Sequence, residues 1–538
     1  MIRRIGASFA AGQRRAGRWI QAAFAVAALL ASAGCNDDKF LTEEPIDFVG
    51  PTNFYRTQAD AIAAINGVYA AFENTSGTNY YGGFFVMLVE FPTEMQTPYL
   101  SAGNERSLVD NYNFTPSHNY IYQAWLNAYV AINRANAVID HVPGIDMDTT
   151  LRARIVGEAK FLRALHYFNL VRLFGGVPLY VHETTSLDSL QRPRATAAQV
   201  YDLIIQDLRD AIAVLPPASA YGPGDSGRAS RGAAKTLLAK VYIQRAGTGV
   251  GTPADYQTAL DILRDIDATE GYALLPNYGD LFDMKHEVNQ EVIFDIQCTR
   301  APGLGCRISN QVAPRKSNYG NSQNGSFTAE MPFFEEFALN DKRRAVTWQL
   351  SFVDKNDNIV TWDSTQSAKG TYGADTPYMR KFLDSLSTGY DEANYIILRY
   401  ADNLLMESEA INEIEGPTAA AYAPINLVRE RAGIGDLVPG LSKEAFRDSV
   451  FHERRLELAM EGPNGYFDSQ RNWAWASARI VANMQLGKAT GFKTSKYPKA
   501  APFDAPPIPD KFKLMPIPQR ACDLNPLLEQ NPGWGSCR

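Results

Sequence analysis

Two carboxylates four residues apart form the first candidate catalytic pair in this sequence. Glu453 and Glu457 lie in the run HERRLELAMEG, with Arg454 and Arg455 between them. On a helix this spacing puts both carboxylates on one face, where such a pair can act as general acid and base. The same pattern is typical of ion pairs between packed helices, in which arginines bind carboxylates with two hydrogen bonds. The arginines favour ion pairs, and we expect no catalytic residues and no enzyme activity.

The histidines do not form a metal or nucleophile motif. The protein has six of them, spread widely along the chain. His286 and Glu287 lack the second histidine of a HExxH zinc site, and His166 lies inside an apolar run, where a hydrogen-bonded core residue is expected. The sequence contains no nucleophile elbow, phosphate-binding loop or nicotinamide fingerprint. We therefore expect no metal and no cofactor.

Aromatic side chains in loop-like stretches are better candidates, because they could bind sugars. Flat rings stack on the C–H faces of sugars, while neighbouring amides and charged groups bind the hydroxyls. Two stretches combine such rings with Gly, Asn and Ser, residues 79–105 and 317–327, and Trp348 and Trp362 lie nearby in sequence. A packing role in the core is the alternative for each of them. The candidate ligand-binding residues are Tyr80, Tyr81, Tyr99, Asn104, Tyr319 and Trp362.

Helices must position these loops, because apolar residues at helical spacing predict a mainly α fold. Joints rich in Gly or Pro separate the helices into pairs, and one αα-hairpin cannot bury its own apolar face, so the pairs must stack. The pair at 230–272 is similar to a tetratricopeptide repeat, with Ala234 and Ala239 where its helices would cross. The expected helices span residues 58–72, 118–142, 151 to the Gly175-Gly176 pair, 196–215, 230–247, 255–272, 395–414, 419–434 and 442–462.

Three other segments lack helical periodicity. Residues 73–117 read as loop, and residues from about 273 to 393 read as a loop-rich insertion with short strands such as 291–298 and 359–364. An irregular segment of that length is usually functional. The tail from about 490 to 538 is rich in Pro and is expected to wrap the surface.

The N-terminus has the pattern of an export signal. Five arginines and no acid occur before Trp19, and an almost wholly apolar run follows to Gly34. This predicts a signal peptide at 1–34 that is too short to span a bilayer. Cys35 follows Ser32, Ala33 and Gly34, which resembles the lipobox of bacterial lipoproteins except that Ser32 replaces an aliphatic residue. The resemblance implies acylation of Cys35, with residues 35–52 as a tether; an ordinary signal peptide with an accidental cysteine is the alternative.

Net charge and cysteine spacing further restrict the class of protein that this chain can be. The chain has 52 basic and 59 acidic residues, and loss of the five N-terminal arginines leaves 47 against 59, a formal charge of −12. Such a chain is not expected to bind nucleic acid by neutralising phosphates. Cys298 lies near Cys306 and Cys522 near Cys537, so an exported protein could form two local disulfides; free buried thiols are the alternative.

Several motifs, taken in order, resemble the starch-utilisation-system D family, also called RagB/SusD. Each motif alone is weak evidence for the family, but their order along nearly the whole mature chain is specific to it. They are FLTEEP after Cys35, NRANAVID (133–140), GEAKFLRALHYFNLVRLFGGVPL (157–179), RASRGAAKTLLAKVYI (228–243), LRYADNLLMESEAIN (398–412), VRERAGI (428–434), HERRLELAMEGPNGYFDSQR (452–471) and PIPQRACDLNPLLEQNPGW (516–534).

The resemblance implies a single SusD-like domain over 53–538. Its helical scaffold, of four tetratricopeptide-like units, would cover about 53–272 and 394–476, with the insertion and the tail added to it. It implies an outer-membrane lipoprotein facing the cell exterior, which binds an oligosaccharide or a peptide and delivers it to a SusC-like TonB-dependent barrel. A surface glycan hydrolase with an unrecognised carboxylate pair and a protein-binding tetratricopeptide adaptor are the alternatives. The ligand is not readable from the loops.

Overall fold

Helices make up most of this computed structural model, which describes residues 54–72, 80–99, 104–186, 190–301, 305–320, 323–362, 376–461, 464–490 and 507–537. Residues Thr57–Arg538 form one unit. The signal peptide expected at 1–34, the lipidated Cys35 and the tether at 35–52 lie outside the described residues and stay predictions. Within the described ranges, no helix combines the length and the apolar character that a membrane crossing requires.

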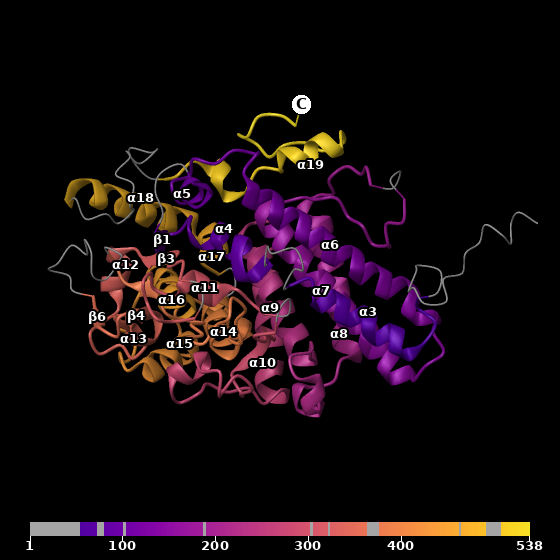
Figure 1. Ribbon diagram of the computed structural model, residues 1–538, viewed down its shortest axis with the longest axis horizontal. Helices are drawn as coiled ribbons and strands as arrows, with labels where there is room; N and C mark the ends of the chain where they lie inside the picture. The colour runs from indigo at the N-terminus through magenta and orange to yellow at the C-terminus, as the bar shows by residue number, and fades with distance from the viewer. Residues whose placement is uncertain are drawn as a thin grey trace, which may run out of the picture. The chain divides into compact units, whose positions relative to one another are not determined.

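The N-terminal scaffold is a series of helices, each packed on the next. Helix α7 is buried on every side along its second half, where its polar residues Arg163, His166, Asn169 and Arg172 are buried together with the apolar ones. Gly175, with φ of 70°, ends it. Figure 1 shows α3, α6, α7 and α8 at right and α9 and α10 near the middle. The bounds are α3 Gln58–Tyr69, α6 Asn119–His141, α7 Thr149–Phe174, α8 Ala197–Val214, α9 Arg231–Gly247 and α10 Ala254–Thr269.

The scaffold continues with α14 (Tyr400–Glu415), which packs on α10, and with α15 (Ala419–Ala432) and α16 (Lys443–Leu458), which pack on α14. The mainly α fold is therefore confirmed. The helix expected at 395–414 is wrong in its first five residues, which form strand β8 (Tyr395–Arg399) against β2 (Val292–Ile296). All five residues of β8 are buried. A short apolar run of this kind has no periodicity that separates strand from helix.

The insertion contains the short strands that its sequence predicts. A four-stranded antiparallel sheet has the order β1-β3-β7-β4, and β5 pairs with β6 as a hairpin. Figure 1 shows β1, β3, β4 and β6 at left with α12 and α13. The bounds are β1 Gln96–Pro98, β3 Phe327–Ala329, β4 Trp348–Gln349, β5 Ser351–Val353, β6 Ile359–Thr361, β7 Tyr378–Met379, α11 Ile308–Val312, α12 Met331–Glu336 and α13 Arg344–Thr347.

The loop expected at 73–117 is wrong for its middle part. A π-helical turn, η1 (Tyr80–Phe84), leads into α4 (Phe85–Glu90), and α5 (Glu105–Asp110) follows β1. Every residue of α4 is buried. The run FFVMLVEF is apolar on all sides, which is the pattern of a helix enclosed by the protein rather than of a loop.

The C-terminal part packs more deeply than its Pro-rich composition predicts. Ile508, Met515 and Ile517 are fully buried, whereas Pro507, Pro509 and Asp510 are exposed, so residues 507–517 insert apolar side chains into the core at intervals. Disulfides join Cys298 to Cys306 and Cys522 to Cys537, the local pairing that the spacing predicted. The remaining elements are α17 Asn464–Arg471, α18 Trp473–Thr490, α19 Gln519–Leu524 and the 3₁₀ turns η2 Val142–Gly144, η4 Ala218–Ala220, η5 Pro223–Asp225, η6 Tyr278–Phe282 and η7 Asp510–Lys513.

Candidate functional site

Three of the candidate aromatic residues meet in the structure although they are far apart in sequence. Tyr99, Tyr319 and Trp362 are partly buried and pack against one set of buried side chains, Phe352, Val360 and Tyr378. We call these six residues the aromatic cluster. Each of its three outer rings has one part fixed by packing and another part accessible to solvent, which is the arrangement that stacking on a sugar requires.

The β5–β6 hairpin provides the floor of the aromatic cluster. Phe352 and Val360 are directly opposite in its register, so the pleat points both side chains to the same face. Their neighbours alternate in exposure, as expected for a hairpin with one buried face. Tyr378 lies on β7 of the adjoining sheet, 6.5 Å from Phe352 between ring centroids. The floor is therefore set by strand pairing rather than by loop conformation.

Main-chain hydrogen bonds hold the three outer rings at the edges of these strands. The Tyr99 N–H donates to Ser326 O over 3.1 Å just after β1, and the Trp362 N–H donates to Leu350 O over 2.8 Å just after β6. Asn318, which precedes Tyr319, donates its N–H to Val353 O on β5 over 2.9 Å. Three separate segments are thus fixed to the same small group of strands.

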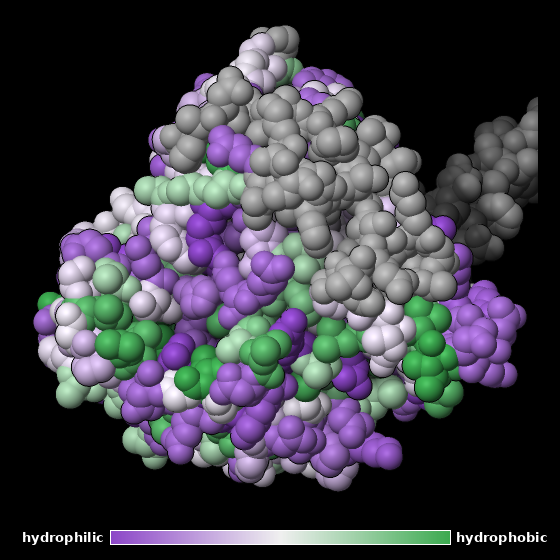
Figure 2. Space-filling view, turned by 90° about the vertical axis from the view of Figure 1, so that its left-hand side faces the viewer, coloured by the Kyte–Doolittle hydropathy of each residue, from purple (hydrophilic) through white to green (hydrophobic). Residues whose placement is uncertain are grey.

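Two cationic side chains accompany the rings. The Arg315 guanidinium lies over the Tyr99 ring, 4.8 Å from its centroid. The Arg344 guanidinium lies 4.4 Å from the centroid of Phe334, and the Phe334 ring makes an edge contact with Trp362 at 5.1 Å. Figure 2 shows the face that lies at left in Figure 1, where β6, α12 and α13 are; its hydrophobic residues stand in separate groups among hydrophilic ones.

Asn104 lies at the start of α5 and not in the aromatic cluster. Its Oδ1 accepts the Arg106 N–H over 2.9 Å and caps the helix. The Arg106 side chain donates to Ser326 Oγ, and Ser326 O accepts the Tyr99 N–H. Asn104 is therefore connected to the aromatic cluster through Arg106 and Ser326, as part of its support.

Tyr80 and Tyr81 are not at a surface, so the expectation that they are exposed is wrong. Their exposed fractions are 2% and 1%. Tyr80 stacks on Phe85 at 4.5 Å, and the Tyr81 hydroxyl accepts a hydrogen bond from Asn169. Burial raises the pKa of Tyr81 to about 12. Both rings belong to the core because their part of η1 is buried and α4, which follows, is buried along its whole length.

His166 lies beside these tyrosines, stacked on Phe72 at 5.0 Å between ring centroids. It is a core residue as expected, but neither ring nitrogen makes a hydrogen bond within the described part of the chain, so the expected hydrogen bond is wrong. Burial lowers its pKa from 6.5 to about 3. The folded state therefore keeps His166 neutral at a pH where the unfolded chain binds a proton, and this difference destabilises the fold as pH falls below 6.5.

The substitution His166→Leu should remove that pH dependence. Between pH 6.5 and pH 5 the buried imidazole reduces the free energy of unfolding by up to about 1.4 kcal/mol per pH unit. We expect the variant to gain about 2 kcal/mol on wild type over this interval, measured as the difference between urea unfolding curves at the two pH values. If the change from pH 6.5 to pH 5 shifts the unfolding curves of wild type and variant equally, the buried histidine does not destabilise the fold at the lower pH.

The carboxylates Glu453 and Glu457 belong to a buried ion-pair network, as the neighbouring arginines predict. Both are fully buried. Arg343 Nη1 lies 2.6 Å from Glu453 Oε1 and 3.0 Å from Glu457 Oε2, and Arg399 Nη1 lies 2.6 Å from Glu457 Oε1. Arg431 also binds Glu457. No sugar can reach these carboxylates, so the acid–base interpretation of this pair is wrong.

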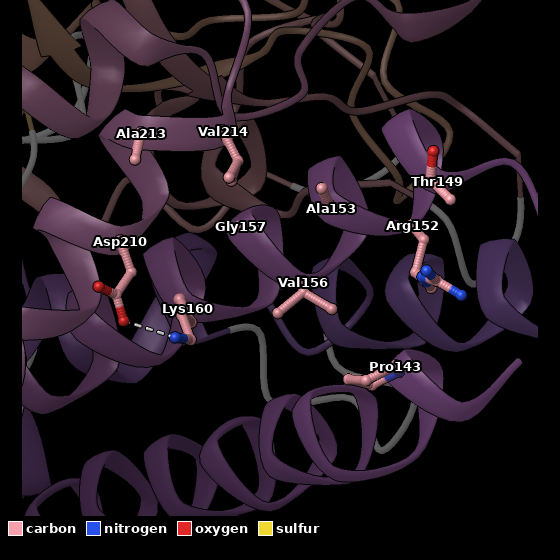
Figure 3. A pocket seen from close by; sticks show the side chains of 10 residues that line it. All are labelled: Pro143, Thr149, Arg152, Ala153, Val156, Gly157, Lys160, Asp210, Ala213 and Val214. Atoms are coloured by element: carbon pink, nitrogen blue, oxygen red, sulfur yellow. Dashed lines mark hydrogen bonds and ion pairs between the residues drawn. The ribbon is translucent and has the colours of Figure 1, made fainter.

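A groove of about 460 Å³ lies elsewhere on the scaffold, between α7 and α8. Figure 3 shows Lys160 bound to Asp210 at one end, 2.5 Å apart, and Arg152 toward the other, with Ala153, Val156 and Val214 between them. The groove contains no aromatic ring and none of the candidate ligand-binding residues. Its composition does not fit sugar stacking.

Most residues of the floor and flanks of the aromatic cluster could not be predicted from the sequence. Phe352, Val360 and Tyr378 are ordinary strand residues in sequence, and Phe334 lies in a short helix. Arg315 was detectable in principle, because PRKSNY places two cations just before Tyr319. Trp348, also noted in sequence, is fully buried against Phe333 and Phe337.

A family model described as the SusD family matches residues 249–534, which is more than half of the chain. The chain belongs to the SusD family. A second model, described as "Starch-binding associating with outer membrane", matches residues 39–243. Together the two models span both the helical scaffold and the strands that carry the aromatic cluster of this SusD-family protein.

Individual SusD-family relatives match this chain over different shares of their length. SusD-like protein P2 of Formosa agariphila is 26% identical over 94% of this chain and 98% of its own length. The starch-binding protein SusD of Bacteroides thetaiotaomicron is 27% identical over 34% of this chain and 31% of its own. The crystal structure of a SusD homologue from Bacteroides thetaiotaomicron superimposes with a TM-score of 0.77 at 26% identity, covering 90% of this chain and 98% of that one.

Proposed function

We propose that this SusD-family protein is a non-catalytic lipoprotein of the cell surface that captures oligosaccharides and delivers them to a SusC-like TonB-dependent barrel. The observation that carries the binding role is the meeting of Tyr99, Tyr319 and Trp362 over one buried floor. Exposed rings held on strands lose little conformational freedom when a sugar stacks on them, which favours binding. The starch-binding description of the matching family model, and that of the relative from Bacteroides thetaiotaomicron, support a carbohydrate as the ligand.

Calorimetric titration of the purified mature protein with maltoheptaose, laminarihexaose and acidic oligosaccharides tests capture. We expect saturable binding to at least one of these probes, with every oligosaccharide recovered intact after prolonged incubation. Shortened products would instead favour the surface hydrolase. Absence of binding to every glycan probe, including acidic ones, would favour the protein-binding adaptor, and binding to peptides alone would move the ligand to that class.

Delivery to a barrel and anchoring at Cys35 are tested in the native bacterium. A tagged wild-type chain should fractionate with the outer membrane and copurify with a TonB-dependent receptor. The Cys35→Ala variant should appear in the soluble fraction, because two or more acyl chains are needed for stable anchoring. A variant that stays in the membrane fraction would remove the lipid anchor from the proposal.

A further inference from the structure

The aromatic cluster carries positive charge in an otherwise acidic protein. The segment 305–329, which contributes Tyr319 and β3, contains Arg307, Arg315 and Lys316 and no acid. Residues 376–382 around Tyr378 add Arg380 and contain no acid, whereas the buried Lys381 of that segment is already paired with Glu461. The chain as a whole has seven more acids than bases. The local excess of cations is therefore not a consequence of overall composition.

Arg315, from the first of these segments, and Arg344, on α13, are placed at the rings without a carboxylate of the described residues to neutralise them. Arg315 is exposed, and Arg344 is partly buried with its Nε enclosed and without a hydrogen bond; neither forms an ion pair with any acid of the described residues. The contrast is Arg343, which is next to Arg344 in sequence and binds Asp341 and Glu453 through charge-assisted hydrogen bonds. A partly enclosed guanidinium without an anion is a group that a ligand could satisfy.

Among the described residues, the acid closest in sequence to the cluster is Asp354, and its carboxylate is already occupied. Asp354 in the β5–β6 turn accepts the N–H groups of Asn356 and Asn358 over 2.8 and 2.9 Å. These bonds lower the pKa of Asp354 and keep its carboxylate directed at its own turn. Asp354 is therefore not the counter-ion of Arg315. The two segments are nevertheless joined, because Lys355, next to Asp354, donates its N–H to the main-chain oxygen of Lys316, next to Arg315, over 3.2 Å.

We infer that the oligosaccharide bound at the aromatic cluster is acidic, and that Arg315 binds its anionic group beside the sugar ring that stacks on the cluster. The inference rests on the proposed function and names its substrate class. A guanidinium over a ring uses its flat face for the cation–π contact and keeps its in-plane N–H donors for a planar anion. A uronate carboxylate or a sulfate ester lies one or two bonds from its sugar ring. Such an anionic group could therefore reach Arg315 while the sugar ring stacks on the aromatic cluster.

The experiment compares three probes on four proteins. The probes are an oligogalacturonate for carboxylate, a chondroitin sulfate hexasaccharide for sulfate, and laminarihexaose as a neutral sugar. The proteins are wild type, Arg315→Gln, the control Arg520→Gln and Trp362→Ala. Arg520 lies over the Tyr122 ring at 4.8 Å, the same distance as Arg315 from Tyr99, but on α19, at the top of Figure 1 and away from β6.

Arg315→Gln should weaken binding of one acidic probe roughly 10-fold to 100-fold, the range for loss of a charge-assisted hydrogen bond. It should leave any neutral binding unchanged, and Arg520→Gln should match wild type on every probe. Wild-type affinity for the acidic probe should fall when salt rises from about 0.05 to about 0.5 M, because exposed charges are screened.

Each result decides a separate point. Binding of the neutral probe alone, unaffected by Arg315→Gln, overturns the acidic ligand and leaves carbohydrate capture in place. Acidic binding that Arg315→Gln and Arg520→Gln weaken equally shows only a general charge effect and also overturns the assignment. Absence of binding to all three probes and to maltoheptaose, in protein with a wild-type circular dichroism spectrum, overturns carbohydrate capture itself.

Discussion

Replacing Glu457 by glutamine should lower the free energy of unfolding by about 3–5 kcal/mol, the largest stability effect that we predict. The Glu457 carboxylate is fully buried and binds Arg343, Arg399 and Arg431 together. A neutral amide cannot balance the guanidinium groups, and its NH₂ group would meet their N–H donors. Urea unfolding at pH 7 measures the loss.

The same substitution has a defined pH dependence. Burial alone would raise the pKa of Glu457, but Arg431, Arg399 and Arg343 outweigh burial and hold the pKa well below its usual range. A carboxylate with a depressed pKa in the folded state stabilises the protein above its unfolded pKa, near 4.5, and loses that contribution as pH falls. The difference in free energy of unfolding between wild type and Glu457→Gln should therefore become smaller below about pH 4.

Glu444→Gln is the matched control, because Glu444 lies on the same helix α16 with an exposed side chain. Because Glu444 is an acid in the first turn of the helix, its loss should lower the free energy of unfolding only slightly, and by much less than the loss of Glu457 does. If both variants lose the same free energy of unfolding, the loss at Glu457 is not specific to the buried ion-pair network. If Glu457→Gln is as stable as wild type, the network contributes no more to stability than surface ion pairs do.

Replacing Trp362 by alanine should weaken oligosaccharide binding roughly 30-fold, or abolish it, while the protein stays folded. Truncation of a central aromatic residue at a binding site typically removes about 2 kcal/mol or more of binding free energy. Trp362 is partly buried at the end of the hairpin, held by its main-chain bond to Leu350 and by the Phe334 ring. Titration with whichever probe binds wild type measures the change.

A second tryptophan provides the control for this prediction. Trp534 is also partly buried, packs on Phe114 and Phe512, and lies in the C-terminal tail away from the aromatic cluster. Trp534→Ala should bind the probe as wild type does. Trp362→Phe should recover part of the affinity, because a smaller ring still offers a stacking face. Wild-type affinity in Trp362→Ala would remove the aromatic cluster as the binding site.

The helical scaffold was readable from sequence because helix signals are local. The expected helix at 118–142 corresponds to α6 (Asn119–His141), and that at 230–247 to α9 (Arg231–Gly247). Apolar residues three and four positions apart and Gly or Pro at the joints are enough to place such helices. The run YIILR was misread, because a five-residue apolar stretch has no period, and its partner β2 lies about a hundred residues earlier.

The candidate site also combines features that are local in the sequence with features that depend on the folded chain. The order of residues was enough to identify the available rings, the carboxylates accompanied by arginines, and a scaffold of stacked helix pairs. Packing in the folded chain places Tyr80 and Tyr81 in the core and brings Tyr99, Tyr319 and Trp362 together over one floor. Periodicity records neighbours along the chain, whereas the exposure of a ring depends on which distant segments cover it, and the pairing of β5 with β6 and of β7 with β3 brings those segments together.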